Sequence, residues 1–538
     1  MKRWNGWGNV NTSYHLPPSA LRYLQKRIGE GARTPDATLA GIVASVPESR
    51  IPNLPQVNVD PEVRLRHSRG HSLPDWIALR SGQINTFTDG VAYPSADEEI
   101  QELFELARVN AIHIIPYGGG TSVVGHINPK SDGIATLTID LSRFNKLLSI
   151  DKSSHLALIE AGIRGPDLER QLRSEGFTLG HFPQSFEYST LGGWIATRSS
   201  SQQSHYYGRI EDTFAGGHIE SPAGPIDINP VPASAAGPDL RHIILGSEGR
   251  FGVITRASMR IRPLPVVEGF FAAFFRDWDS GVSAVRTLAQ LGTKLSMLRL
   301  SDAIETETTL SLSGKDKLVT WAGRGLRLLG FGSNRCLLIY GITGDKKSVA
   351  LAIEQSSSII RSQGGIVAGK MIGTQWQKSR FLTPYLRNTL WEFGYAIDTL
   401  ETAVPWNKVT NLASTLKDSI IKQAENFGIK VLVFGHLSHV YRDGASIYVT
   451  YIIPRTSSAD ELLRQWNSMK TAASRAIHLH GGTITHQHGI GQDHLPFLEA
   501  EKGKIGIDIL RNIRNICDPD AILDPHVLFK NTDQSRMD

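Results

Sequence analysis

Residues 116–122 read Pro-Tyr-Gly-Gly-Gly-Thr-Ser and follow a short apolar run, residues 111–115, which predicts a buried strand. Glycine tolerates positive φ and carries no side chain, so three in a row let backbone N–H groups converge on an anion such as phosphate. The stretch is neither the Gly-x-Gly-x-x-Gly of a Rossmann unit nor a phosphate loop ending in Gly-Lys-Ser/Thr. Because a triple glycine alone is more often an ordinary turn, its meaning depends on the sequence around it.

Four further segments follow the glycine loop in order: 182–190 (Phe-Pro-Gln-Ser-Phe-Glu-Tyr-Ser-Thr), 191–200 (with Leu-Gly-Gly-Trp and Thr-Arg-Ser-Ser), 207–212 (Tyr-Gly-Arg-Ile-Glu-Asp) and 246–255 (Gly-Ser-Glu-Gly-Arg-Phe-Gly-Val-Ile-Thr). With the loop, this ordered set resembles the FAD-binding domain of the vanillyl-alcohol oxidase family. The resemblance implies that the loop holds the FAD pyrophosphate and that the later segments line the isoalloxazine and adenine rings. The implied FAD contacts are Pro116, Tyr117, Gly118, Gly119, Gly120, Thr121, Ser122, Gln184, Ser185, Phe186, Glu187, Tyr188, Ser189, Thr190, Thr197, Arg198, Ser199, Ser200, Glu248, Gly249, Arg250, Phe251, Gly252, Val253 and Ile254.

The resemblance also implies the fold class: an α+β protein with a PCMH-type FAD-binding domain and an α+β cap domain of the FAD-linked oxidase C-terminal type. We divide the chain into an N-terminal extension (1–80), the FAD-binding domain (81–265), the cap or substrate domain (266–480) and a C-terminal segment (481–538) that carries active-site residues and returns to the FAD-binding domain. No histidine or cysteine lies in the glycine loop, so non-covalent FAD is expected.

Periodic apolar residues predict several elements in this frame. Residues 21–27, 98–110, 165–175 and 347–363 read as helices; the second carries Ile100, Leu103, Phe104 and Ala107 on one face. Strands are predicted at residues 134–141, 156–161 and 337–340.

Composition limits the classes of function. The chain has 538 residues, 40% of them hydrophobic and 20% charged, as in soluble globular proteins of two or three domains. A net charge of +5 does not argue for nucleic acid, but it tolerates an anionic substrate or peripheral contact with a membrane surface. Two cysteines exclude a disulfide framework and a thiolate metal cluster, which favours a cytoplasmic location. A homodimer is also expected.

Histidines gather in two cap segments, His436 with His439 and His486 with His488. Three interpretations stay open. The histidines are polar residues satisfied in loops, they bind a metal, or they form part of an acid–base site for an anionic substrate. If residues 484–490 are a strand, His486 and His488 point to one face. A dehydrogenase branch of the superfamily binds a divalent metal through Gly-His-Leu-Gly-Asp-Gly-Asn-Leu-His and Glu-His-Gly segments. Here the first pattern breaks after residue 437 and the glutamate is Gln487, so we expect no metal.

The third interpretation rests on a second resemblance, which runs nearly end to end. The segment 439–448, the start at 3–8 (Arg-Trp-Asn-Gly-Trp-Gly) and residues 386–406 resemble the alkyldihydroxyacetonephosphate synthase family. This implies that Tyr448 is the catalytic tyrosine, that Arg387 binds the substrate phosphate, and that His486 and His488 lie in a triple-histidine motif beside the flavin. Gln487 departs from that motif, and a glutamine changes no charge but still forms hydrogen bonds. Without the resemblance, Tyr448 reads as a strand residue that packs an aromatic face.

The implied activity is FAD-dependent exchange of the acyl group of acyl-dihydroxyacetone phosphate for a long-chain alcohol, a transferase step of ether lipid synthesis. The substrate is therefore a phosphorylated, lipid-like small molecule. The alternative is an FAD-linked oxidase or dehydrogenase of a 2-hydroxy acid or a phosphorylated glycerol, since one fold supports several reactions. For Tyr448 to act as a base near neutral pH, its pKa must fall from about 10, and we expect Arg387 and protonated histidines to lower it.

Overall fold

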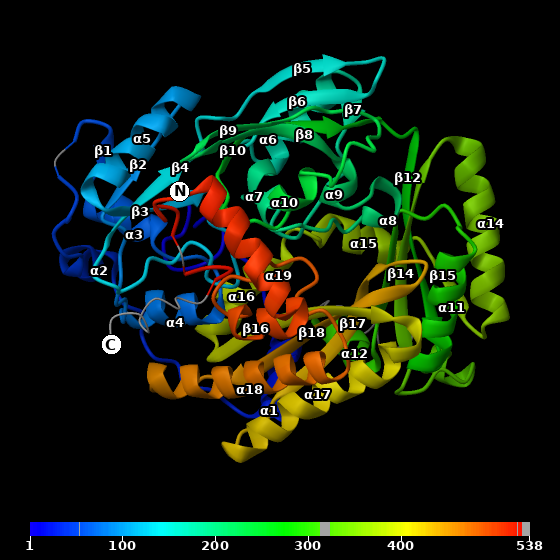
Figure 1. The fold of residues 1–538 in the computed structure, drawn as a ribbon. Coiled ribbons are helices and arrows are strands. Elements are labelled where there is room, and N and C mark those ends of the chain that lie inside the picture. The colour runs from blue at the N-terminus through cyan, green and yellow to red at the C-terminus, as the bar shows by residue number, and fades with distance from the viewer. Residues whose placement is uncertain (53, 313–322, 525, 530–538) are drawn as a thin grey trace.

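The computed structural model describes residues 1–52, 54–312, 323–524 and 526–529. These residues form three sheets of four, five and seven strands, together with a short two-stranded sheet, and helices pack against them (Figure 1). The α+β class expected from the sequence is confirmed. None of the helices in these residues combines the length and apolarity needed to cross a bilayer.

The four-stranded sheet, in the order β1-β2-β4-β3, places the glycine loop. Its strands are β1 (Val57–Asn58), β2 (Gly90–Ala92), β3 (Ile112–Tyr117) and β4 (Ala135–Asp140), and α3 (Pro61–His67) and α5 (Asp97–Asn110) pack against them. Helix α2 (Leu39–Ser45) contacts α3, whereas α4 (Leu73–Ser81) packs against the cap. The predicted apolar face of α5, with Ile100 and Phe104, is buried. Strand β3 runs parallel to β4, so the glycine loop begins at the carboxyl end of a buried strand. The division of the chain at residue 80 stays a prediction, and β1, which precedes it, belongs to this sheet.

The five-stranded antiparallel sheet, in the order β5-β6-β10-β8-β9, carries the later cofactor segments. Its strands are β5 (Leu147–Asp151), β6 (Leu156–Glu160), β8 (Phe214–Ser221), β9 (Gly224–Ile228) and β10 (Val253–Arg260). The helices between them are α6 (Gly165–Ser174), α7 (Leu191–Ala196), α8 (Ser204–Tyr207), α9 (Ile210–Thr213) and α10 (Arg241–Ile244). The two-stranded sheet pairs β7 (Phe177–Thr178) with β11 (Arg262–Pro263). Helix α7 begins where the Thr190 side chain accepts a hydrogen bond from the Gly193 N–H. The Leu-Gly-Gly-Trp segment therefore forms the first turns of a helix.

The seven-stranded sheet of the cap has the order β15-β12-β14-β13-β17-β18-β16. Its elements are β12 (Val267–Phe275), α11 (Trp278–Gln290), β13 (Met297–Ser301), α12 (Ala303–Leu312), β14 (Cys336–Gly344), α14 (Lys346–Ser362), β15 (Ile366–Gly369), α15 (Met371–Ser379), α16 (Thr383–Glu392), β16 (Tyr395–Pro405), η1 (Trp406–Lys408), α17 (Val409–Asn426), β17 (Leu432–Val440), β18 (Gly444–Pro454) and α18 (Ala459–Leu479).

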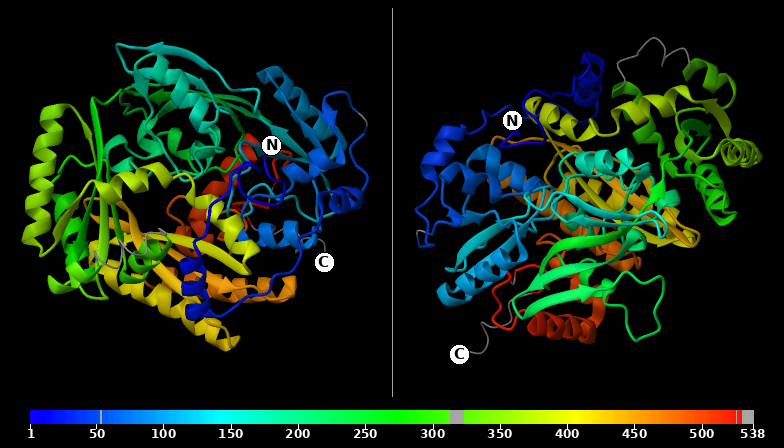
Figure 2. Two further views of the ribbon diagram at one scale, coloured as in Figure 1. Left: turned by 180° about the vertical axis from the view of Figure 1, so that it is seen from behind. Right: turned by 90° about the horizontal axis from the view of Figure 1, so that it is seen from above.

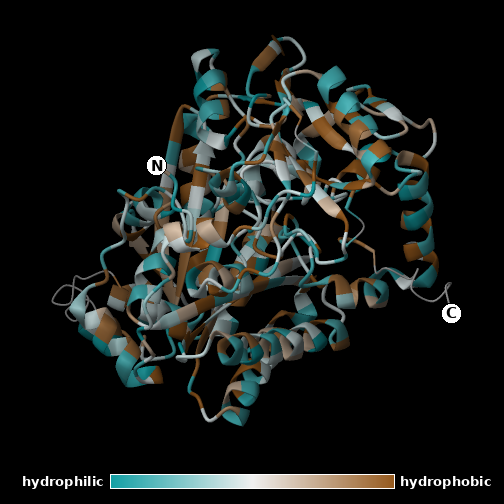
Figure 3. Ribbon diagram, turned by 90° about the vertical axis from the view of Figure 1, so that its left-hand side faces the viewer, coloured by the Kyte–Doolittle hydropathy of each residue, from teal (hydrophilic) through white to brown (hydrophobic). Residues whose placement is uncertain are grey.

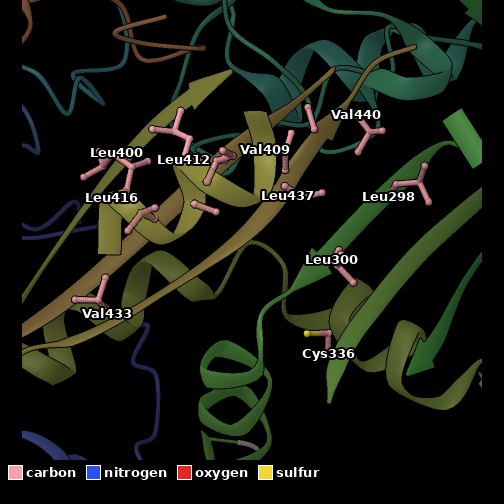
Figure 4. Close-up of a cluster of buried hydrophobic side chains, with 14 of the residues drawn as sticks. Leu298, Leu300, Cys336, Leu400, Val409, Leu412, Leu416, Val433, Leu437 and Val440 are labelled. Atoms are coloured by element: carbon pink, nitrogen blue, oxygen red, sulfur yellow. The ribbon is translucent and has the colours of Figure 1, made fainter. Parts of the chain in front are cut away.

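One face of the cap sheet holds the largest core. Side chains of α11, α14, α17 and α18 pack against it. Figure 4 shows part of this core, with Leu412 and Leu416 of α17 and Val433 and Leu437 of β17. The outer helices alternate hydrophobic and hydrophilic residues along their length, as one-sided burial requires (Figure 3). The opposite face meets α16 and the N-terminal helix α1 (Pro18–Ile28), which runs beside the cap rather than beside the first sheet (Figure 2). Because only part of this second face is covered, a cavity remains between it and the FAD-binding sheets.

The chain returns from the cap through residues 480–494 and helix α19 (Leu495–Cys517). The return is fixed where Leu523 pairs with Ile114 of β3 in a parallel bridge. Residues 484–490, in which a strand would place His486 and His488 on one face, form an irregular loop instead. Gly489 and Gly491 both have positive φ, and the carboxylate of Glu248 accepts hydrogen bonds from the N–H groups of Ile490 and Gly491, so the backbone is held by a side chain instead of a sheet.

Candidate functional site

A central cavity of about 1260 Å³ lies between the glycine loop and the uncovered face of the cap sheet. The glycine loop, the residues after Phe182 and the turn after Glu248 line one end. Side chains of β13, β14, α16, β17 and β18 line the other. The cavity is therefore shared by both domains, and its size suits a large cofactor together with a second molecule.

The glycine loop packs so closely that side chains do not fit. A Cβ at Gly118 would lie 2.3 Å from Thr190 Oγ1, and one at Gly119 would lie 1.8 Å from the Tyr188 carbonyl oxygen. At Gly120 the backbone has φ +66°, and a Cβ there would lie 2.1 Å from the Tyr117 hydroxyl. These glycines are thus required by the protein's own packing, and the loop presents bare backbone to the cavity.

The lining beyond the loop offers hydroxyl groups suited to the phosphates and ring edges of FAD. Ser122, Ser189, Thr197 and Ser200 all line the cavity. Ser200 Oγ is buried and has no hydrogen-bond partner among the described residues, which is costly unless a ligand supplies one. The residues present therefore fit FAD.

Most of the predicted cofactor residues line this cavity, and several do not. Those that line it are Pro116, Tyr117, Gly118, Gly119, Gly120, Thr121, Ser122, Gln184, Ser185, Ser189, Thr190, Thr197, Ser199, Ser200, Glu248, Gly249, Gly252 and Ile254. Those that lie outside it are Phe186, Glu187, Tyr188, Arg198, Arg250, Phe251 and Val253. The outlying side chains have structural contacts instead. For example, Phe186 stacks on Phe381 at 5.1 Å, and Arg198 forms an ion pair with Glu211 at 3.2 Å.

Arg387 stands on α16 and lines the cavity. Its guanidinium stacks over Trp76, 4.4 Å from the ring centroid, and donates one hydrogen bond to the His71 carbonyl. Nε and Nη2 are buried without a hydrogen-bond partner in the described parts of the chain. Burial lowers its pKa to about 10, so it stays charged at neutral pH. A fixed guanidinium whose Nε and Nη2 form one unused edge is suited to an oxyanion such as phosphate.

Tyr448, on β18, lines the same cavity. Its ring stacks on His436 with 4.9 Å between centroids, and His488 meets it edge-on at 6.0 Å. Tyr448 and His488 therefore lie together, whereas His486 is directed away from the cavity, with Nε2 2.6 Å from the Tyr441 hydroxyl.

The expected electrostatics of Tyr448 are wrong. Burial raises its pKa well above the usual value, and burial lowers the pKa of His436, His439 and His488, which are thus neutral near pH 7. The sequence shows that histidines are near, but not that their burial disfavours the protonated form. In the protein alone, Tyr448 keeps its hydroxyl proton and the neighbouring imidazoles are free to accept one.

Gln487 has a definite structural role. Its Nε2 donates to Glu401 Oε2 at 2.6 Å, and its Oε1 accepts from the Ser200 N–H at 3.3 Å. Glu401 is fully buried; burial acts to raise its pKa, but the nearby histidines, His486 first, hold it well below its usual value. The amide thus links a buried carboxylate of the cap to a hydroxyl-bearing turn of the FAD-binding domain without a charge of its own.

Sequence reasoning missed Arg299 and Glu305. Arg299 lines the cavity from β13, and its Nη2 lies 2.7 Å from Glu305 Oε1 and 3.2 Å from His436 Nδ1. Burial works against the charge on Glu305, but His436 and Arg299 lower its pKa to about 2. A signal was present, because Arg299 is the single charged residue in the apolar strand Met-Leu-Arg-Leu-Ser.

Comparison with known proteins agrees with this geometry. Residues 88–226 match the model of an FAD binding domain, and residues 264–528 match that of the C-terminal domain of FAD linked oxidases. The alkyldihydroxyacetonephosphate synthase of Dictyostelium discoideum is 30% identical, over 98% of this chain and 93% of its own length. That of Trypanosoma brucei brucei is 27% identical over 98% and 92%. A solved structure of an alkyldihydroxyacetonephosphate synthase superposes with a TM-score of 0.84 at 29% identity, covering 97% of this chain and 98% of the other.

Proposed function

The chain belongs to the family of the alkyldihydroxyacetonephosphate synthases, with FAD as its cofactor, and from this premise we propose that it replaces the acyl group of acyl-dihydroxyacetone phosphate with a long-chain alcohol. The observation that carries the proposal is that one cavity is lined by the glycine loop, by Tyr448 and by Arg387. Two nitrogens of Arg387, Nε and Nη2, have no hydrogen-bond partner among the described residues. Bound flavin supplies an electrophilic ring for the substrate carbon, without net oxidation.

The chain's own residues account for the remaining steps. Arg387 binds the phosphate through its unused N–H groups. The C1 proton goes to Tyr448 after the phenol has passed its own proton to a neutral imidazole such as His488; His486, outside the cavity, supports the loop through Tyr441. The C1–O bond of the ester breaks, and the carboxylate leaves with the electron pair. The alcohol oxygen forms the new bond to C1 as its proton is released, and Tyr448 returns a proton to C1.

The apolar part of the cavity supports a lipid-like substrate. Phe274, Leu337, Ile339, Ile372 and Trp376 all line it. A long hydrocarbon chain gains about 0.8 kcal/mol for each methylene that such a surface removes from water. Peripheral membrane contact, a homodimer and a cytoplasmic location belong to the same proposal; a substrate that partitions into lipid supports the first of these.

Anaerobic titration of the purified protein separates the proposal from its alternative. Acyl-dihydroxyacetone phosphate is expected to bleach the flavin stably without reducing an added dye. Rapid dye reduction with D-lactate or a phosphorylated glycerol would identify an FAD-linked dehydrogenase instead. Release of unmodified FAD by heat or acid would agree with non-covalent binding.

Arg387→Lys is expected to raise the Kd of dihydroxyacetone phosphate by about 10-fold or more, because a point charge replaces two aligned N–H groups. The measurement is isothermal titration with the flavin-loaded protein. Arg80→Lys is the matched control, since Arg80 also stacks over Trp76, at 4.9 Å, but is paired with Asp36 and does not line the cavity. Equal affinities for wild type and Arg387→Lys would move the phosphate site elsewhere.

Treatment with a chelator is expected to leave turnover unchanged. His436 is engaged by Arg299, and a cationic neighbour opposes metal binding there. Glu401, His439 and His486 do bring three ligand atoms within 4.8 Å. However, the Ser438 hydroxyl donates to Glu401 Oε1 at 2.6 Å, and the Arg209 guanidinium, 3.3 Å from the other ring nitrogen of His486, opposes a cation nearby. Turnover that disappears with EDTA and returns with zinc or manganese would contradict this expectation.

A further inference from the structure

We propose that Arg299 forms a second anion subsite in the central cavity, which binds the carboxylate of the leaving fatty acid. This inference rests on the proposed function, because acyl exchange produces a second oxyanion besides the phosphate. Nothing in the comparisons assigns a ligand to this arginine.

The side chains of β13 alternate between the cavity and the core. Met297, Arg299 and Ser301 line the cavity, whereas Leu298 and Leu300 point into the core on the other face of the sheet. This is the alternation that a strand imposes. Arg299 is therefore directed into the cavity by the register of the strand, with Ile339 of β14 as its cross-strand partner.

Arg299 uses only one of its three guanidinium nitrogens in hydrogen bonds with the described residues. Nη2 contacts Glu305 and His436, while Nε and Nη1 form no hydrogen bond with the described residues. The side chain keeps 28% of its surface exposed, on the lining of the cavity. A guanidinium has five N–H groups, so those of Nε and Nη1 remain to donate to a carboxylate after Glu305 is satisfied.

Arg299 shares the cavity with Tyr448 and Arg387. Arg299 contacts His436, which stacks on Tyr448, and Arg387 lines the same cavity from α16. Two guanidinium groups and the acid–base residue thus line one cavity. Breaking the C1–O bond of the substrate also gives two anionic parts, one with the phosphate and the other with the carboxylate of the acyl group.

The cavity that Arg299 lines also has an apolar wall. Met297, Leu337, Ile339 and Phe274 join one buried apolar cluster and line the cavity. A charged head beside an apolar wall suits an amphiphile such as a long-chain fatty acid. A long-chain alcohol would contact only the apolar wall, through its hydrocarbon chain, because its hydroxyl group carries no charge.

The test compares two ligands with the same chain on the flavin-loaded protein. Palmitate is expected to bind Arg299→Met with a Kd raised about 10- to 100-fold, the usual loss for a charge-assisted pair. The Kd of hexadecanol is expected to change less than about twofold. Arg387→Met is the matched control, and it is expected to weaken dihydroxyacetone phosphate but not palmitate.

Two further measurements keep the result decisive. Arg299→Met leaves Glu305 without its partner, so if this variant does not fold, Arg299→Lys replaces it, with a smaller but selective loss of palmitate affinity expected. An unchanged palmitate Kd, or equal losses for palmitate and hexadecanol, would overturn the subsite and leave Arg299 as a packing residue. If wild type exchanges acyl groups in either of these cases, the proposed function still stands. Failure of wild type to bind palmitate and acyl-dihydroxyacetone phosphate would overturn both proposals.

Discussion

Tyr448→Phe is expected to lower the rate of acyl exchange by about 10²–10⁴-fold, the usual contribution of a general acid–base group. The substitution removes one hydroxyl from the cavity and keeps the ring that stacks on His436. Folding and FAD content are therefore expected to stay at wild-type levels. The measurement is single-turnover release of fatty acid from acyl-dihydroxyacetone phosphate, normalised to bound flavin.

Tyr451→Phe is the matched control for this experiment. Tyr451 lies on the same strand, but it faces the core and its hydroxyl donates to Asp398 at 3.2 Å. Its loss is expected to affect stability by about 1 kcal/mol and turnover little. Near-normal turnover of Tyr448→Phe would show that Tyr448 only packs on His436, and the proton acceptor would then be sought at His488 or at the pair Tyr441 and His486.

Gly119→Val is expected to yield protein with little or no flavin. A Cβ at this position would lie 1.8 Å from the Tyr188 carbonyl oxygen, a contact that no backbone tolerates. The clash is with the neighbouring segment, so we expect it to displace the whole loop that holds the pyrophosphate.

The measurement is the ratio of flavin to protein absorbance, with FAD released by heat or acid. Gly332→Val is the control, since a Cβ there meets nothing within 4 Å and no positive φ is required. Circular dichroism shows whether the Gly119→Val protein is folded without flavin. Full flavin occupancy in a folded Gly119→Val variant would mean that this loop does not hold the cofactor.

Local patterns predicted the elements and the cofactor loop well. The predicted helices at residues 98–110 and 347–363 are present as α5 and α14 within one residue, because an apolar face at helical spacing is a local property. The glycine loop follows a buried strand as expected. FAD and the two-part architecture, predicted from the order of the motifs, are confirmed.

What failed depends on contacts between distant residues. The charge states around Tyr448 were wrong because burial, and not the number of nearby histidines, decides whether an imidazole is protonated. The sequence left open whether residues 484–490 form a strand, and they form a loop because Glu248, more than two hundred residues earlier, holds that backbone. Arg299 was missed because only the register of β13 shows that it faces the cavity.

The most direct test of the account is the fate of oxygen in the complete reaction. The flavin-loaded protein is incubated with acyl-dihydroxyacetone phosphate, ¹⁸O-labelled hexadecanol and a redox dye, and the products are analysed by mass spectrometry. Acyl exchange at C1 predicts alkyl-dihydroxyacetone phosphate that contains the label, an equal amount of unlabelled fatty acid, and an unreduced dye. No ether product in this incubation, together with dye reduction in a parallel incubation with a 2-hydroxy acid, would contradict the proposed exchange and identify a dehydrogenase.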